Sequence, residues 1–177
     1  MSRCFFACER IRLRALEPED LGLLSRLEND SSLWHATHTT APYSNFILRQ
    51  YIESNQADLF VDKQLRLIIE RNEDNEAIGM VDLFDFSPMN LRAEVGILIA
   101  PEYQRQGYAK EAVNALISYA FDYVKLRQLY AYVSEQNQAS TALFESCGFI
   151  EQARLVDWVY TPSGFCDALV FQLLNKS

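Results

Sequence analysis

An apolar strand that leads through a short polar loop into an amphipathic helix restricts the folds open to this chain more than any other feature. The mostly apolar segment 93–100 has the length of a buried strand, and Pro101 ends it because proline cannot donate a hydrogen bond to a neighbouring strand. Over 109–124, apolar residues recur at the spacing of a helix with one buried face. Together these parts predict a fold of the mixed α/β class.

The rest of the chain supplies further strands and helices in a regular order. Alternating or β-rich segments predict six more strands, over 9–15, 65–71, 77–86, 129–134, 154–160 and 168–174. Start and stop signals predict three more helices, over 17–30, over 44–55 with Ser44 as cap, and over 140–147 with Gly148 after its end. No repeat and no linker interrupts this order, so residues 1–177 are predicted to form one α/β domain.

The charge and the apolar runs limit the partners. The formal net charge is −8 at pH 7, which argues against nucleic acid and mildly favours a cationic substrate. The longest apolar run, 95–100, is far shorter than the roughly 20 residues that span a bilayer, and the first ten residues lack the shape of a secretory signal. We expect a soluble cytoplasmic protein with no nucleic-acid and no membrane partner.

The cysteine and histidine residues do not favour a metal site. The four cysteines form no C-x-x-C pair, and the chain has two histidines. A zinc site would have to be assembled from Cys4, Cys8, His35 and His38, and the reduced thiols of a cytosolic protein are the better interpretation. No bound metal is predicted.

The loop 104–109, with the sequence QRQGYA, is a candidate anion site. The first amides of a helix have no partner within it and carry the positive end of its dipole. Gly107 allows close approach of a ligand, and Arg105 adds a positive charge. An ordinary strand-to-helix turn explains these residues equally well. Neither G-x-G-x-x-G nor G-x-x-x-x-G-K-[ST] occurs in the chain, so a pyrophosphate-bearing cofactor of another kind fits better.

Two segments resemble the motifs of the GNAT N-acetyltransferases. Gln104, Gly107 and Ala109 match the family's loop pattern [RQ]-x-x-G-x-[GA]. The segment VSEQNQASTALFESCGF, 133–149, is similar to the second motif, an asparagine followed by a small or hydroxyl residue and a helix that ends in Gly-Phe. The start of the chain, 10–30, is also similar to members of this family. Within it, the chain resembles the branch of the spermidine and the ribosomal-protein N-terminal acetyltransferases.

The resemblance implies both a fold and acetyl-CoA as cosubstrate. The fold would be a mostly antiparallel seven-stranded sheet whose fourth and fifth strands splay apart, flanked by about four helices. In the splay, the backbone of Ile97, Leu98 and Ile99 would bond the pantetheine arm. Asn137 would also bond the arm, and Ser140 would lie near it. The pyrophosphate would be held by consecutive residues: Gln104, Arg105, Gln106, Gly107, Tyr108, Ala109 and Lys110.

Acyl transfer to an amine requires a base, because an ordinary ammonium group with a pKa of about 10.4 is almost entirely protonated at neutral pH. Glu94, on the fourth strand, stands where some family members carry this base. An ion pair with Arg92 is the alternative role for its carboxylate.

The usual general acid of the family is missing. A tyrosine of the second motif normally protonates the leaving thiolate, and Phe144 stands at the matching position, where it would pack on the pantetheine. Ser140, Thr141 or Tyr132 are left to orient a water. The chain is therefore an active N-acetyltransferase, an acetyl-CoA-binding module without catalysis, or a structural protein without a cofactor, and the first is preferred.

The acceptor pocket of the family lies between the first two helices, their connecting loop and the last hairpin. The residues expected there are Trp34, Tyr43, Asp82 and Trp158, although core packing or solvent exposure explains each of them as well. The loop lacks the adjacent acidic residues of polyamine-acetylating members. A polyamine and a peptide or protein N-terminal amine remain the leading acceptors, acetylated by direct attack in a ternary complex. Dimers are common in the family, so a homodimer is the oligomer to test.

Overall fold

A computed structural model describes residues 5–31, 33–34, 39–161 and 163–176. Cys4, His35 and His38 lie outside these ranges, so the structure does not address a zinc site that includes them. Within the described ranges, no cluster of three or more His, Cys, Asp or Glu residues is arranged to hold a metal ion. None of the helices described there is long and apolar enough to span a membrane.

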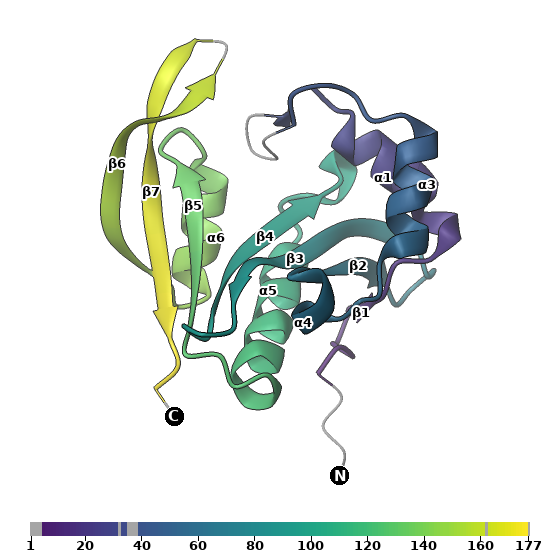
Figure 1. Cartoon of the computed structure of the whole chain (residues 1–177), viewed down its shortest axis with the longest axis horizontal. Helices are drawn as coiled ribbons and strands as arrows, with labels where there is room; N and C mark the ends of the chain where they lie inside the picture. The colour runs from purple at the N-terminus through teal and green to yellow at the C-terminus, as the bar shows by residue number, and fades with distance from the viewer. Residues whose placement is uncertain (1–4, 32, 35–38, 162, 177) are drawn as a thin grey trace.

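One seven-stranded sheet forms the centre of the molecule (Figure 1). Its strands are β1 Ile11–Arg14, β2 Leu65–Arg71, β3 Ala77–Ser87, β4 Arg92–Ile99, β5 Gln128–Ser134, β6 Ile150–Thr161 and β7 Gly164–Leu174. Their order across the sheet is β1-β2-β3-β4-β5-β7-β6. β4 and β5 pair in parallel and the other neighbours pair antiparallel, which confirms the expected mostly antiparallel sheet.

Among the residues that the structure describes, all four predicted helices are present, with one short α-helix in addition. The helices are α1 Leu21–Glu28, α3 Asn45–Ser54, α4 Leu59–Asp62, α5 Tyr108–Ser118 and α6 Gln138–Ser146. The Ser44 hydroxyl accepts a hydrogen bond from the Ile47 amide at 3.2 Å and caps α3 as expected. The unpredicted α4 begins where the Asp58 carboxylate accepts from the amides of Phe60 and Val61.

Two elements differ from the predicted ones in more than the exact position of their ends. The helix over 109–124 is α-helical only to Ser118, and its last turn, Tyr119–Tyr123, widens into a π-helix. The last hairpin is longer than predicted: β6 and β7 stay paired as far as Thr161 and Gly164, where the Thr161 hydroxyl donates to the Gly164 carbonyl at 2.8 Å, whereas a loop was expected over 161–167.

The helices cover the two faces of the sheet unequally (Figure 1). The larger core lies under α4, α5 and α6 and includes Leu59, Leu116 and Phe144. The smaller core lies under α1 and α3 and includes Leu24 and Ile52. On β2, Leu67 and Ile69 face the larger core while Ile68 faces the smaller one, as period-two alternation requires.

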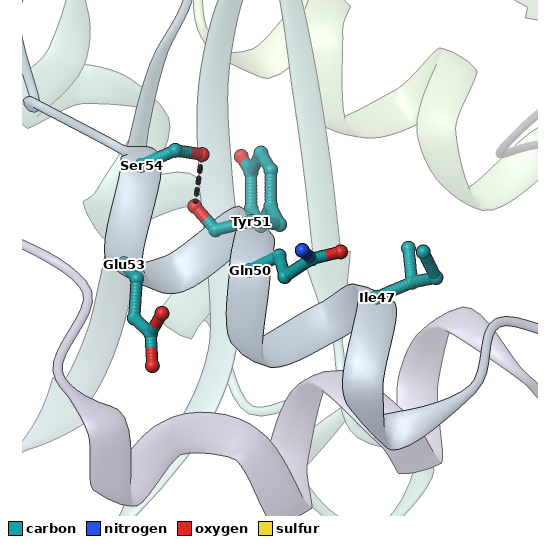
Figure 2. A pocket seen from close by; sticks show the side chains of 5 residues that line it. All are labelled: Ile47, Gln50, Tyr51, Glu53 and Ser54. Carbon is teal, nitrogen blue, oxygen red and sulfur yellow. Dashed lines mark hydrogen bonds between the residues drawn. The ribbon is translucent and has the colours of Figure 1, made fainter.

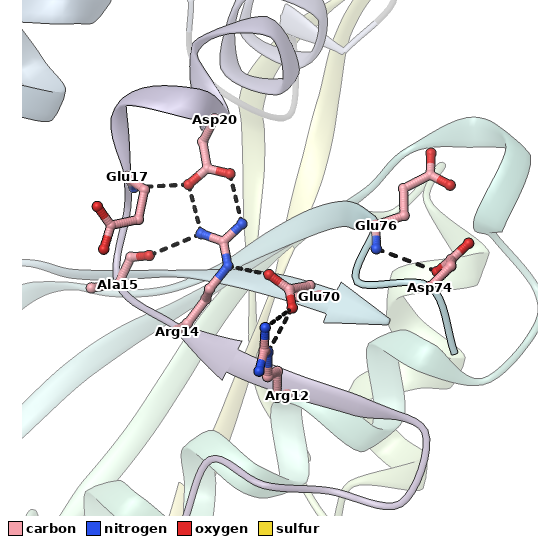
Figure 3. Close-up of polar contacts among 8 residues, drawn as sticks. All are labelled: Arg12, Arg14, Ala15, Glu17, Asp20, Glu70, Asp74 and Glu76. Atoms are coloured by element: carbon pink, nitrogen blue, oxygen red, sulfur yellow. Dashed lines mark hydrogen bonds and ion pairs between the residues drawn. The ribbon is translucent and has the colours of Figure 1, made fainter. Parts of the chain in front are cut away.

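Charged residues on β1 anchor α1 to the sheet. Glu70, 4% exposed, accepts hydrogen bonds from Arg12 at 2.6 Å and from Arg14. Arg14 also binds Asp20 through two parallel hydrogen bonds of 2.7 and 2.8 Å, and Asp20 accepts from the Glu17 amide (Figure 3). The alternating arginines of the first strand therefore fix the turn from which α1 starts.

Candidate active site

The strands β4 and β5 open away from each other, as the resemblance implied. Their parallel ladder has three residue pairs, from Arg92–Gln128 to Glu94–Tyr130, and ends there. β3 continues to pair with β4 as far as Ile99. Figure 1 shows the two strands diverging beyond this point. The backbone of β4 from Val95 to Ile99 therefore presents the edge that faces β5 to the opening.

Glu94 lies at the last rung of this ladder, where the opening begins. Burial raises the pKa of its carboxyl to about 7, a hydrogen bond with the Tyr132 backbone opposes the rise, and the charge of Asp85 adds to it. Among the described residues, Glu94 forms no ion pair with Arg92 or another cation. A carboxyl that is about half ionised at neutral pH is suited to accept a proton there.

The loop 104–109 closes the far end of the opening and begins α5. Gln104 donates through its side chain to the Ile99 carbonyl at 2.9 Å, which ties the loop to the end of β4. Gly107, with φ of 87°, is the N-cap of α5 and contributes no side-chain cap, so the first amides of the helix stay available. Arg105, with φ of 59°, and Lys110 are both exposed beside them.

Not every predicted loop residue presents its side chain to the opening. The Tyr108 side chain is buried in the larger core, so only its backbone can contact a ligand. Across the opening, the Asn137 side chain caps α6 by accepting from the Ser140 amide at 3.1 Å. Asn137 and Ser140 therefore stand at the start of α6, just after β5.

Phe144 belongs to the core in this structure. Its side chain is 3% exposed and packs against Phe149 and Phe171, with ring centroids 5.1 and 6.3 Å away. The resemblance places a general acid at this position on α6, beside β5 and β7, and the phenylalanine side chain has no hydroxyl to act as one.

Restoring a tyrosine at this position is expected to increase the rate of thiol release. Phe144→Tyr should raise kcat by roughly 3- to 10-fold, which is below the usual 10²- to 10⁴-fold of general acid catalysis because a thiolate leaves readily. The hydroxyl should also cost about 1–3 kcal/mol of stability if it stays in the apolar cluster. Initial rates and urea unfolding measure the two effects. Phe149→Tyr, in the same cluster and equally buried, is the matched control; an equal rate for both variants would contradict an acid role.

Three of the expected acceptor residues gather at the end of α1. The Trp34 indole donates to the Glu28 carbonyl at 3.0 Å, and Tyr43 exchanges backbone hydrogen bonds with the Asn29 side chain. Asp82 accepts two hydrogen bonds from Arg66, at 2.9 and 2.8 Å.

The charge of Asp82 is not free, contrary to what its selection as an acceptor residue assumed. Arg66 also donates to Glu28 at 2.7 Å, so one guanidinium joins two carboxylates that are each 8% exposed. The cluster of Glu28, Arg66 and Asp82 keeps one net negative charge. Neither Glu28 nor Arg66 was selected from the sequence, although an arginine inside the apolar run 65–69 was a visible signal.

Trp158 stands apart, on the other side of the opening. It lies on β6, is 59% exposed, and stacks on Tyr132 of β5 with ring centroids 6.4 Å apart. Tyr132 in turn meets the Tyr130 ring edge to face, and the Tyr130 hydroxyl donates to Asp85. An aromatic row thus runs along β5 beside Glu94.

A shallow pocket on α3 is not part of this arrangement. It is lined by Ile47, Gln50, Tyr51, Glu53 and Ser54, all from one helix (Figure 2). No residue selected from the sequence lines it, although its Tyr51 ring has the Arg66 guanidinium of the Glu28–Arg66–Asp82 cluster 5.5 Å from its centroid.

Comparison with known families identifies the class of protein. The family model for the acetyltransferase (GNAT) domain matches residues 10–150. The chain therefore belongs to the GNAT acetyltransferase family, and it is an N-acetyltransferase that uses acetyl-CoA.

Individual relatives agree with this class. Spermidine N(1)-acetyltransferase of Vibrio cholerae is 30% identical over 167 residues, which cover 94% of this chain and 94% of that protein. The putative ribosomal N-acetyltransferase YdaF of Bacillus subtilis is 29% identical over an alignment of 191 positions, which covers 97% of this chain and 96% of that protein. The crystal structure of the Vibrio cholerae spermidine N-acetyltransferase in complex with CoA and spermine has a TM-score of 0.84 at 27% identity and covers 94% of this chain and 96% of that one.

Proposed function

We propose that this protein transfers the acetyl group of acetyl-CoA directly to a primary amine, with Glu94 as the general base. The observation that carries the proposal is the position of a carboxyl with a pKa of about 7 at the last rung of the β4–β5 ladder. A base whose pKa lies near the working pH combines a large ionised fraction with enough proton affinity to deprotonate an ammonium group, directly or through a water.

The residues around the opening fit acetyl-CoA. The uncapped start of α5 at Gly107, with Arg105 and Lys110 beside it, offers amides and positive charge to a diphosphate. The edge of β4 over Ile97, Leu98 and Ile99 offers strand-like hydrogen bonds to the amide groups of a pantetheine arm.

The chain's own groups carry the proton and charge changes of the reaction. Acetyl-CoA supplies the acetyl group as an activated thioester. Glu94 accepts a proton from the acceptor ammonium, so that the neutral nitrogen attacks the carbonyl as the carbon–sulfur bond breaks. The free amides of β4 stabilise the charge that grows on the carbonyl oxygen. The attacking nitrogen loses its second proton as the amide forms, the leaving thiolate takes up one proton to become the thiol, and Glu94 releases the proton that it accepted to solvent.

A polyamine is the first acceptor to test, and a peptide N-terminal amine is the second. The named activity of the Vibrio cholerae relative supports the polyamine, as does the net negative charge of the Glu28–Arg66–Asp82 cluster. The ribosomal relative supports the peptide amine.

A thermal-shift measurement with acetyl-CoA, followed by an amine panel, tests the proposed function. At 100 times its Kd, acetyl-CoA should stabilise the fold by about 2.7 kcal/mol, which raises Tm by roughly 5–10 °C. Thiol release with spermidine, spermine or an N-terminal peptide should then follow. No shift with acetyl-CoA would overturn the proposal. A shift without turnover on any amine would instead support the acetyl-CoA-binding module that Phe144 suggests.

A further inference from the structure

Arg10, the residue just before β1, joins two parts of the candidate diphosphate site that lie about a hundred residues away in the chain. Its Nη1 donates to the Gln106 carbonyl at 2.8 Å. Its Nε and its backbone amide donate to the two carboxylate oxygens of Glu111, at 3.0 and 2.8 Å. Its guanidinium also lies over the Tyr108 ring, 4.9 Å from the centroid. One side chain therefore holds both the loop 104–109 and the first turn of α5.

The bond to Gln106 sets the direction of a loop amide. The peptide between Gln106 and Gly107 is trans, so its carbonyl and its N–H point in opposite directions. Because Arg10 holds the carbonyl, the Gly107 N–H is turned to the opposite side. Gly107 suits this arrangement, since its φ is 87° and a Cβ there would lie 3.1 Å from Arg10 Nη2.

The bonds to Glu111 remove a charge that would oppose an anion. Glu111 is in the first turn of α5, next to the amides that would face a diphosphate. An unpaired carboxylate there would repel the phosphates through a partly buried environment, where screening is weak. Its side chain is 17% exposed, and Arg10 neutralises it through two charge-assisted hydrogen bonds.

We propose that Arg10 is a positioning residue for the diphosphate of acetyl-CoA: it turns the Gly107 amide toward the phosphates and cancels the charge of Glu111. The inference rests on the proposed function, which places the diphosphate at the loop 104–109. Arg10 acts on the cosubstrate through the loop and the helix, and it has no part in the chemical step.

Two acetyl donors separate this role from a general effect on folding. Acetyl-CoA carries the diphosphate, whereas S-acetylpantetheine has the same thioester and arm without it. Arg10→Ala should raise the KM for acetyl-CoA and the Kd for CoA at least tenfold, with kcat changed less than about threefold, because charge-assisted bonds are lost only at the diphosphate end. The kcat/KM for S-acetylpantetheine should stay within about twofold of the wild type.

Three further variants test which property of Arg10 affects the binding of acetyl-CoA. Arg10→Lys keeps the charge without the fork of donors and should show an intermediate KM. Adding Glu111→Gln to Arg10→Ala should recover part of the affinity, because the uncompensated carboxylate is gone. Arg12→Ala removes an equal charge two residues along the same strand, where it pairs with Glu70, and is the matched control.

The outcomes decide between the inference and the function on which it rests. An equal loss with both donors, or an Arg12→Ala effect as large as that of Arg10→Ala, would show that Arg10 only holds the fold. No change in the KM for acetyl-CoA would also overturn the inference while leaving the proposed function intact. Failure of the wild-type protein to bind CoA would instead remove the proposed function, and the inference with it.

Discussion

Glu94→Gln should lower kcat/KM for the amine acceptor by about 10²- to 10⁴-fold at pH 8, the usual contribution of a general base. Glutamine keeps the size of the side chain and can still accept a hydrogen bond from the Tyr132 backbone, but it cannot take a proton. Initial rates of thiol release with saturating acetyl-CoA measure the loss. A decrease of less than about threefold would show that another group, or solvent, removes the proton.

The pH profile distinguishes a base from a positioning carboxylate. Burial raises the pKa of Glu94 from 4.5 to about 7, so the folded protein favours the neutral acid over that interval. Wild-type kcat/KM should therefore rise as the pH increases through about 7, and Glu94→Gln should lack this limb. Asp85→Asn should move the limb to lower pH, because the charge of Asp85 helps to raise the pKa of Glu94.

Stability provides the control for this variant. An ionised carboxylate at a buried position opposes folding, and this burial raises the pKa of Glu94 in the folded protein. The contribution of Glu94 to the free energy of unfolding therefore becomes less favourable as the pH rises from 4.5 to about 7. Glu94→Gln should consequently be at least as stable as the wild type at pH 8. A variant that lost both activity and stability would contradict a purely catalytic role.

The sequence was informative where the signal is local. The strand over 93–100, the loop 104–109 and the helix after it are consecutive in the chain, so their periodicity and breaker residues predict each element and its place in the sequence. The splay between the fourth and fifth strands came only from the family resemblance, and the three-pair ladder at Glu94 confirms it. No spacing within β4 alone indicates where a parallel neighbour stops pairing.

Residues that act through distant partners were harder to predict. Arg10 alternates with apolar neighbours like any strand arginine, and only the packing of β1 beside α5 brings it to Glu111 and Gln106. The sequence alone offers Asp82 as a charge that a cationic acceptor could use, but the β2–β3 register places Arg66 directly opposite it. Side-chain pairing across a sheet depends on a register that the sequence does not display.

The Glu28–Arg66–Asp82 cluster should be the most sensitive charged site for stability. Arg66→Met keeps much of the side-chain volume but leaves two buried carboxylates without their shared cation. Breaking a buried ion pair in this way costs about 3–5 kcal/mol, which lowers Tm by roughly 6–20 °C for a chain of this size. Arg66 also lies over the Tyr51 ring, 5.5 Å from the centroid, and methionine loses this cation–π contact as well.

Two further variants test whether the stability lost in Arg66→Met comes from the unpaired carboxylates. Arg154→Met removes an arginine that binds Glu135 and Asp167 at an exposed site, and it should cost less than about 1 kcal/mol. Adding Glu28→Gln and Asp82→Asn to Arg66→Met should restore most of the lost stability, because the carboxylates then no longer need a cation. Urea unfolding followed by circular dichroism measures all the variants. If the triple variant were no more stable than Arg66→Met, lost packing rather than uncompensated charge would explain the effect. If the triple variant instead recovers stability but has a raised KM for a polyamine, the cluster's net negative charge contributes to binding the acceptor. Arg66 would then be the residue that makes this buried charge compatible with folding.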